Sequence, residues 1–206
     1  HGLMGRGTTW SRQLPWLTRY GSVYTYDAPW HRGREVDDTE PVSTERFVEQ
    51  LARAVEPLGE SAVLIGHSMG GLHSWCLAAE RPELVCGLVI EDMAPDFVGG
   101  TTGAWEPWLH ALPTEFPSAE AIFSEFGEVA GRYFLEAFER TPTGWRLHGK
   151  PAMWVDIAAV QPLPEASLRA IAEVAGLQRF SNHAYLFREG EEPDFVYCFV
   201  EGGVVL

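Results

Sequence analysis

Residues 62–71 read AVLIGHSMGG, a short apolar run followed at once by glycines around a serine. The continuous apolar run at 62–65 predicts a strand buried on both faces of a parallel sheet. Residues 72–80 then predict a helix, which ends at Arg81-Pro82, and residues 85–90 predict a second buried strand. Strand, helix and strand of these lengths form a βαβ unit, so we expect an α/β fold with a parallel sheet.

The serine lies in Gly66-His67-Ser68-Met69-Gly70, which matches the pattern G-x-S-x-G between a buried strand and a helix. In that position a serine occupies a strained turn, where side chains at the flanking glycines would clash. The turn exposes the Ser68 hydroxyl, and the helix N-terminus behind it stabilises developing negative charge. The motif therefore predicts a nucleophilic serine; the alternative is a tight glycine turn with an idle serine.

Two further elements are predicted before this motif. Residues 22–28 alternate apolar and polar side chains and predict a strand. Ser43 or Thr44 can cap a helix that ends at Gly59. Apolar side chains recur every fourth residue along that helix, which gives it one buried face: Phe47, Leu51 and Val55.

The composition changes after residue 95. Glycines and prolines interrupt 96–117, and residues 118–140 predict a helix capped by Ser118. An apolar stripe on that helix is either helical core or a lid over an apolar pocket: Ile122, Phe126, Val129, Tyr133 and Phe134. Residues 163–175 predict an amphipathic helix, and two β-rich runs follow at 184–187 and 195–200.

Composition excludes several function classes. The 206 residues are 46% hydrophobic, enough to bury a core, and carry 29 acidic against 15 basic side chains, a net charge of −14. Nucleic-acid and anionic membrane partners are disfavoured because both require Lys and Arg. Cys76, Cys86 and Cys198 form no disulfide framework or metal spacing, so we expect no metal and a reducing compartment. We expect a cytoplasmic protein, since the sequence shows no membrane-spanning or leader-like apolar run.

Taken with these motifs, two loops carry a resemblance to a known family. His1-Gly2-Leu3-Met4-Gly5 resembles the HG-containing loop of the α/β-hydrolase superfamily, and residues 27–34 resemble its D-x-P-G-x-G-x-S loop, with departures at Trp30, Arg32 and Arg34. The resemblance is to esterase-like members and covers residues 1 to about 158. It implies a doubly wound, mostly parallel sheet with a helical lid, truncated at both ends.

The resemblance also implies three regions and a chemistry. Residues 1–95 would be a partial hydrolase core, 96–160 the helical lid, and 161–206 a tail. Ser68 would attack an ester-type carbonyl of a small apolar acyl substrate and form an acyl-enzyme, without a cofactor. The backbone N–H groups of Leu3 and Met69 would form the oxyanion hole, while Gly66, His67 and Gly70 shape the elbow and His1 holds the loop.

The acid and the base of the triad should follow the serine in the order Asp or Glu, then His. Asp92, at the end of the second strand, is the preferred acid, with Glu91, Asp96 and Asp156 as alternatives. His183 is the preferred base because it lies late in the chain, with His110 and His148 before it. We expect His67 and His73 to be neighbours of the elbow, since helix geometry points them away from Ser68.

The tail has a different resemblance. Residues 186–191 and 196–204 are similar to the first half of a cyclic-nucleotide-binding domain, although the portion that would hold the phosphate is not in the sequence. Two alternatives to a serine esterase therefore stay open. One is a catalytically incomplete hydrolase fragment or fusion without the triad histidine, and the other is a cofactor-free haloperoxidase-like enzyme on the same scaffold.

Overall fold

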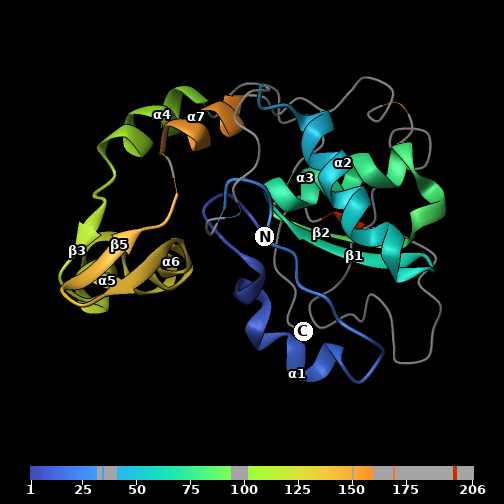
Figure 1. Ribbon diagram of the computed structural model, residues 1–206, viewed down its shortest axis with the longest axis horizontal. Helices are drawn as coiled ribbons and strands as arrows, with labels where there is room; N and C mark the ends of the chain where they lie inside the picture. The colour runs from blue at the N-terminus through green and yellow to red at the C-terminus, as the bar shows by residue number, and fades with distance from the viewer. Residues whose placement is uncertain are drawn as a thin grey trace, which may run out of the picture.

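The computed structural model describes residues 1–31, 34, 41–93, 102–149, 151–159, 169 and 197–198. Figure 1 shows a parallel sheet flanked by α2 and α3 at one end of the molecule, and α4, α7 and a second small sheet at the other. We call the second group the α4–α7 unit (residues 102–149 and 151–159). The N-terminal segment, in blue, runs between the two groups.

The helices in chain order are α1 (Leu14–Leu17), α2 (Thr44–Val55), α3 (Met69–Glu80), α4 (Thr102–Ala111), α5 (Ala119–Phe126), α6 (Glu128–Phe134) and α7 (Pro151–Ala159). Short 3-10 helices are η1 (Gly7–Arg12), η2 (Glu56–Leu58), η3 (Pro82–Leu84) and η4 (Leu135–Ala137). The strands are β1 (Ala62–His67), β2 (Val85–Glu91), β3 (Glu115–Phe116), β4 (Phe138–Thr141), β5 (Gly144–Leu147) and β6 (Tyr197–Cys198).

The parallel sheet has the strand order β1-β2-β6. β1 and β2 pair in parallel, with Ile65 opposite Val89, and α3 connects them, which confirms the predicted βαβ unit. β6 lies within the β-rich run predicted at 195–200 and pairs in parallel with Val89 and Ile90 of β2. Of the predicted helix at 163–175 the structure describes Arg169 alone, in a helical conformation, and the β-rich run at 184–187 lies outside the described residues.

Helix α2 begins as the sequence predicts. The Ser43 hydroxyl accepts a hydrogen bond from the Arg46 N–H at 3.2 Å, which satisfies one of the free amides at the helix start. The predicted apolar face is buried, and two of its residues pack with α3 and β2 in an aliphatic core: Val48, Leu51, Ala52, Val55, Leu72, Trp75, Cys76, Leu77, Leu88, Ile90 and Met93. This core fixes α3 behind the end of β1.

The prediction of one helix over 118–140 is wrong. Ser118 caps a helix as expected, accepting from the Ala121 N–H at 3.3 Å, but α5 stops at Phe126. Gly127 has φ 80° and ψ 163°, a conformation open to glycine alone, and the chain changes direction there before α6. After Ala137 the chain enters β4, in an antiparallel sheet of order β3-β5-β4.

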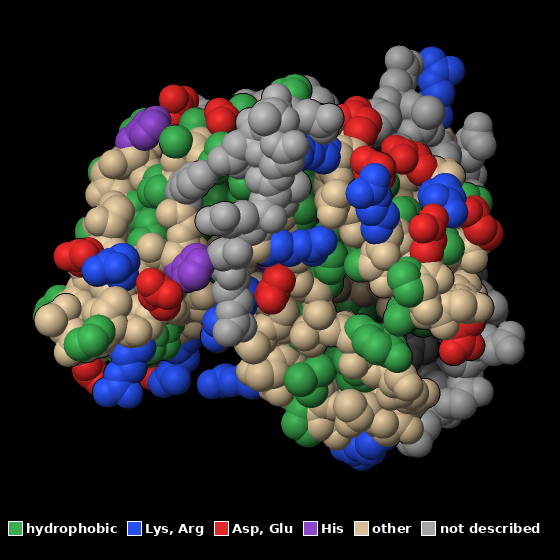
Figure 2. Space-filling view, in the orientation of Figure 1, with side chains coloured by type: hydrophobic (Ala, Val, Ile, Leu, Met, Phe, Trp, Pro, Cys, Tyr) green, Lys and Arg blue, Asp and Glu red, His purple; other side chains and the backbone are tan. Residues whose placement is uncertain are grey.

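The predicted strand at 22–28 is absent. Those residues form no strand ladder, and Tyr24 is 69% exposed. An alternating sequence becomes a strand only when a neighbouring strand supplies its hydrogen bonds, and no described strand lies against this segment. The segment instead crosses the surface beside η1 and α1, where Figure 2 shows hydrophobic side chains gathered.

A second core joins the α4–α7 unit to the rest of the molecule. Met4, Trp30, Phe47 and Met69 pack with residues of the unit in one buried cluster: Leu109, Leu112, Ile122, Ala137, Phe138, Leu147, Trp154 and Ile157. Within the described part of the chain, no helix combines the length and apolar character needed to cross a membrane.

Candidate active site

Ser68 occupies the turn between β1 and α3 in a backbone conformation that non-glycine residues rarely adopt, with φ 49° and ψ −120°. Its N–H donates to the Glu91 carbonyl of β2 at 2.8 Å, and its carbonyl accepts from the Leu72 N–H at 3.0 Å. Backbone strain of this kind costs roughly 1–3 kcal/mol and persists only where surrounding contacts hold it. The parallel sheet and α3 therefore present Ser68 at the carboxyl end of β1.

Glycine is required on both sides of the serine because backbone approaches too closely for a side chain. A Cβ on Gly66 would lie 2.6 Å from the Gly70 carbonyl oxygen. A Cβ on Gly70 would lie 2.6 Å from the carbonyl oxygen of His1. The two glycines thus bring β1, the start of α3 and the N-terminal loop into direct contact.

That loop, residues 1–5, is called here the HG loop. Gly70 N–H donates to the His1 carbonyl at 3.1 Å, which docks the loop on the first turn of α3. The His1 ring is buried: Nε2 accepts from the Ala28 N–H at 2.9 Å, so Nδ1 carries the proton and donates to the Gly2 carbonyl at 2.9 Å. His1 thereby ties the HG loop to the segment that ends in Ala28, and its nitrogens are both occupied.

Asp92 follows β2 directly and has a positive φ of 52°. Its side chain is 88% exposed, and its Oδ2 lies 3.9 Å from Nε2 of His67. Burial lowers the pKa of His67, and the carboxylates of Glu91 and Asp92 oppose that shift. Asp92 follows β2 and therefore lies next to His67 of the elbow, which ends the neighbouring strand β1.

The remaining described histidines divide into buried and exposed ones. Burial lowers the pKa of His31 to about 4 and that of His73 to about 3, and the His73 ring stacks on Phe47 with 4.4 Å between centroids. His110 and His148 lie in the α4–α7 unit, beside Glu106 at 3.7 Å and Glu139 at 3.1 Å. Both buried rings are neutral core groups at neutral pH.

Other candidates are dispersed. Asp156 is exposed on α7, and Asp96 and His183 lie outside the described residues. Among the residues that the structure describes, no three His, Cys, Asp or Glu side chains gather closely enough to hold a metal ion. The elbow, the HG loop and Asp92 are therefore the part of the expected site that the described chain brings together.

One contact to the HG loop was missed by sequence reasoning. The Tyr133 hydroxyl of α6 donates to the Leu3 carbonyl at 3.0 Å, and its ring packs edge-on against His67 with 5.7 Å between centroids. In the sequence Tyr133 was one member of an apolar stripe. Its hydroxyl, the only polar group in that stripe, is the one signal that could have suggested this contact.

Comparison with known proteins shows the family to which the chain is similar. The profile of the Alpha/beta hydrolase family matches residues 1–197. The sn-1-specific diacylglycerol lipase ABHD11 of Mus musculus is 36% identical over 107 residues, 50% of this chain and 34% of the lipase. A pimeloyl-acyl-carrier-protein methyl ester esterase of Xanthomonas campestris pv. campestris is 28% identical over 140 residues, 68% of this chain and 49% of the esterase.

Solved structures lead to the same fold. A structure described as a marine microorganism esterase superposes with a TM-score of 0.63 at 26% identity, over 80% of this chain and 68% of that one. E-2-(acetamidomethylene)succinate hydrolase superposes with a TM-score of 0.62 at 22% identity, covering 77% and 62%. The chain belongs to the alpha/beta hydrolase family. It spans a third to a half of the length of the two curated relatives above, 34% and 49%.

Proposed function

We propose that this chain is a serine hydrolase that cleaves a carboxylic ester, or a similar small acyl substrate, through an acyl-enzyme on Ser68. The observation that carries the proposal is the strained Ser68 backbone, φ 49°, at the junction of β1 and α3, with the HG loop docked beside it on Gly70. A serine held in this conformation has its hydroxyl free of the helix and aimed toward an incoming carbonyl. The esterase and lipase names of the relatives support ester chemistry.

The oxyanion hole would be formed by the backbone N–H groups of Met69 and Leu3. Met69 is the first residue of α3, so its N–H has no partner within the helix and benefits from the positive helix end. Leu3 lies on the HG loop. A hydrogen bond of 3.1 Å from the Gly70 N–H to the His1 carbonyl oxygen holds this loop on α3. A donor of this kind is typically worth ~2.7–4 kcal/mol of transition-state stabilisation.

Asp92 is our proposal for the acid and His183 for the base. Asp92 is supported by its place directly after β2, next to the elbow, and His183 by chain order alone. Replacing Asp92 by Asn should lower kcat about 10⁴-fold if it orients the base, as in other triads. Glu91→Gln changes the preceding exposed carboxylate, which is an alternative acid, and should keep its activity if Asp92 is the residue that orients the base. Unchanged hydrolysis by Asp92→Asn would remove it from the triad.

For His183, the corresponding test is His183→Ala, which should abolish hydrolysis. If a histidine is the base, hydrolysis should also fall below about pH 6, because the base must be neutral to accept the serine proton. A pH–rate profile without an acid limb, or an active His183→Ala variant, would contradict this assignment.

The α4–α7 unit is our proposal for the lid. It packs Tyr133 against the HG loop and shares a buried cluster with Met69, the residue after the nucleophile. The side chains that this unit packs against Met69 are apolar, so a substrate that lies between the unit and the elbow would be a small apolar acyl group rather than a charged one. Replacing Trp108, which packs on Phe126 and Phe134 in this unit, by Ala should alter the preference between acetyl and longer acyl esters.

The proposal as a whole is tested by hydrolysis of p-nitrophenyl esters of two to eight carbons. The native chain should turn over, and Ser68→Ala should lose at least 10³-fold in kcat because only the oxyanion hole remains. Ser61→Ala, an exposed serine just before β1, should retain full activity. Equal activity of Ser68→Ala and the native chain would overturn the proposal.

A further inference from the structure

The HG loop is a tight turn in an unfavourable conformation. Gly5 N–H donates to the Gly2 carbonyl at 3.0 Å, so residues 2–5 close a β-turn. Met4, at the third position, has φ 66°, whereas Leu3 is not among the residues with positive φ. This is the type II arrangement, which normally places glycine where Met4 stands. A methionine there costs energy, so contacts from elsewhere must hold the turn in this form.

Tyr133 supplies such a contact. Its hydroxyl donates to the Leu3 carbonyl at 3.0 Å. That carbonyl belongs to the central peptide of the turn, and its orientation is what distinguishes type II from the commoner type I. A Cβ on Gly2 or Gly5 would lie 2.8 or 2.6 Å from the Tyr133 hydroxyl oxygen, so both glycines allow the hydroxyl to reach the backbone. Burial raises the pKa of Tyr133, which keeps the hydroxyl protonated as a donor.

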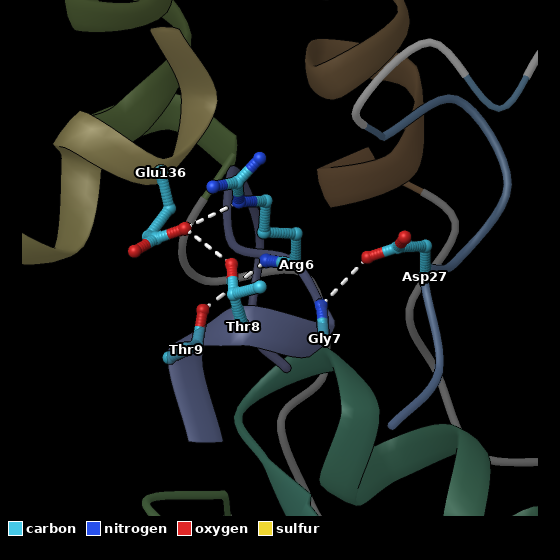
Figure 3. Close-up of polar contacts among 6 residues, drawn as sticks. All are labelled: Arg6, Gly7, Thr8, Thr9, Asp27 and Glu136. Atoms are coloured by element: carbon cyan, nitrogen blue, oxygen red, sulfur yellow. Dashed lines mark hydrogen bonds and ion pairs between the residues drawn. The ribbon is translucent and has the colours of Figure 1, made fainter. Parts of the chain in front are cut away.

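A second contact anchors the same segment one helical turn further on. The Glu136 carboxylate, in η4, pairs with Nε of Arg6 and accepts from the Thr8 hydroxyl at 2.6 Å (Figure 3). On the other side, Gly7 N–H donates to Asp27 at 2.7 Å, also drawn in Figure 3. The pair of Arg6 and Glu136 is only a quarter exposed, with relative side-chain exposures of 24% and 25%. Residues Leu3 to Thr8 are thus held from α6 and η4 at two points.

We infer that Tyr133 is a positioning residue for the reaction proposed at Ser68: its hydrogen bond to the Leu3 carbonyl holds Leu3 in place in the type II turn, and so fixes the position of the Leu3 N–H proposed to bind the oxyanion. This inference rests on the proposed function. An oxyanion donor accelerates a reaction only if it is in place before charge develops, because reorientation during the reaction would use up its advantage. A strained loop held from α6 meets that requirement, and Tyr133 acts on it through the Leu3 carbonyl.

The test compares Tyr133→Phe with the native chain, using the rate at which a fluorophosphonate probe labels Ser68 and the kcat and KM for p-nitrophenyl butyrate. Loss of one hydrogen bond that orients the loop should lower the labelling rate and kcat about tenfold, with KM within about twofold. Tyr24→Phe, an equally conservative change at a tyrosine that is 69% exposed, should label at the native rate. Melting temperatures of all variants show that the comparison is between folded proteins.

A purely structural role is separated by rescue. Glycine adopts a positive φ freely, so the Met4→Gly turn no longer depends on Tyr133 to stay in the type II form. Met4 is also 1% exposed and part of the buried core, so the double variant is compared with Met4→Gly alone, at a temperature where both are folded. Adding Tyr133→Phe to Met4→Gly should therefore lower the labelling rate of Ser68 by less than about threefold, whereas Tyr133→Phe in the native chain should lower it about tenfold. Glu136→Gln, which weakens the second contact, should lower the labelling rate in the same direction and serves as a second variant.

The outcomes separate the two proposals. If the native chain is labelled on Ser68 and Tyr133→Phe is labelled equally fast, the inference is wrong and the proposed function stands. An equal loss in the native and Met4→Gly backgrounds also overturns the inference. If the native chain is not labelled at all, the proposed function fails, and the positioning role falls with it.

Discussion

The parallel sheet with its elbow and the α4–α7 unit are built in opposite ways. In the sheet half, β1, Ser68 and α3 are consecutive in sequence, and the core beneath them is mostly aliphatic. The α4–α7 unit is held by aromatic contacts, among them Trp108, Phe126 and Phe134, and its core includes residues from the first 70 positions. The nucleophile is thus positioned by local chain geometry. The loop proposed to stabilise the oxyanion is held partly by Gly70 of α3 and partly by contacts of Tyr133 and Glu136 with residues 130 positions away in the sequence.

Substitutions in the two halves should therefore disturb the site in different ways. Changes near Ser68 act through steric conflict in a fixed turn, since Gly66 and Gly70 leave no space. Changes in the α4–α7 unit act on a shared core that includes Met4 and Met69, so they reach the site through packing. The following variants test whether the two halves are one cooperative structure, from the largest expected effect to the smallest.

Replacing Trp154 by Ala should have the largest effect. Trp154 of α7 is 1% exposed and belongs to the core that joins the unit to Met4 and Met69, so its loss should lower the free energy of unfolding by about 3–5 kcal/mol. Urea unfolding followed by tryptophan fluorescence and by circular dichroism measures this. Val129→Ala, at a side chain 86% exposed, should change stability by less than about 0.5 kcal/mol. Two separate transitions would show that the halves unfold independently.

Gly66→Ala should have the second-largest effect on stability. Its new Cβ would meet backbone atoms of Gly70 and Gly71 at 2.6–2.7 Å, and backbone cannot move aside as a side chain can. We expect a loss of up to about 3 kcal/mol in unfolding free energy, together with loss of hydrolysis. Gly21→Ala is the control, because nothing lies within 4 Å of its Cβ position. A stable, active Gly66→Ala variant would contradict the tight elbow.

The buried histidines of the sheet half predict an acid-sensitive stability. His73 has a pKa of about 3 in the folded chain against an ordinary value of 6.5. Below pH 6.5 the unfolded chain binds a proton that the folded chain does not, so stability is complete above that pH and falls as the pH is lowered toward 3. Each such histidine lowers the free energy of unfolding by up to about 1.4 kcal/mol for each pH unit of acidification.

His73→Phe should therefore reduce the loss of stability between pH 7 and pH 5, as measured by urea unfolding at each pH. His110→Gln, at a ring that is 58% exposed in the α4–α7 unit, should leave the dependence unchanged. If the free energy of unfolding falls equally between pH 7 and pH 5 in the native chain and in His73→Phe, protonation of His73 is not the cause of the loss.

The smallest effect is expected for exposed ion pairs four residues apart on helices, which occur in both halves. Arg132→Ala in α6 removes a pair with Glu128 at 2.8 Å, and Arg53→Ala in α2 removes a pair with Glu49. Both should lower stability by only about 0.3–0.5 kcal/mol, and less at high salt. A clearly larger loss for Arg132→Ala alone would indicate that the contact of the Arg132 guanidinium with the Phe123 ring, 5.7 Å from its centroid, adds to the ion pair.

The sequence could predict the sheet half because its signals are local. The apolar run of β1, the glycines around Ser68 and the Ser43 cap each act within a few residues. The strand at 22–28 was predicted wrongly because alternation says nothing of whether a partner strand is present. The pairing of β6 with β2 likewise joins segments about 100 residues apart, which no local pattern encodes.

Predictability was lower in the α4–α7 unit and for its role at the site. The apolar stripe at 118–140 has the helical period throughout, yet Gly127 breaks it and the last part becomes β4. The contacts of Tyr133 with Leu3 and of Glu136 with Arg6 join residues 130 apart in sequence. Asp92 could be placed after β2 from the pattern, but its distance of 3.9 Å from His67 needed the structure.

The most direct test of the account is to locate the adduct that a fluorophosphonate probe leaves on the native chain. Intact mass should rise by one probe, and peptide mapping should place it on Ser68, in the segment Gly66–Gly71 that joins β1 to α3. Denatured chain should remain unlabelled, because the reactivity comes from the folded elbow and not from the serine alone. A native chain without an adduct, or with its adduct on another serine, would contradict the account.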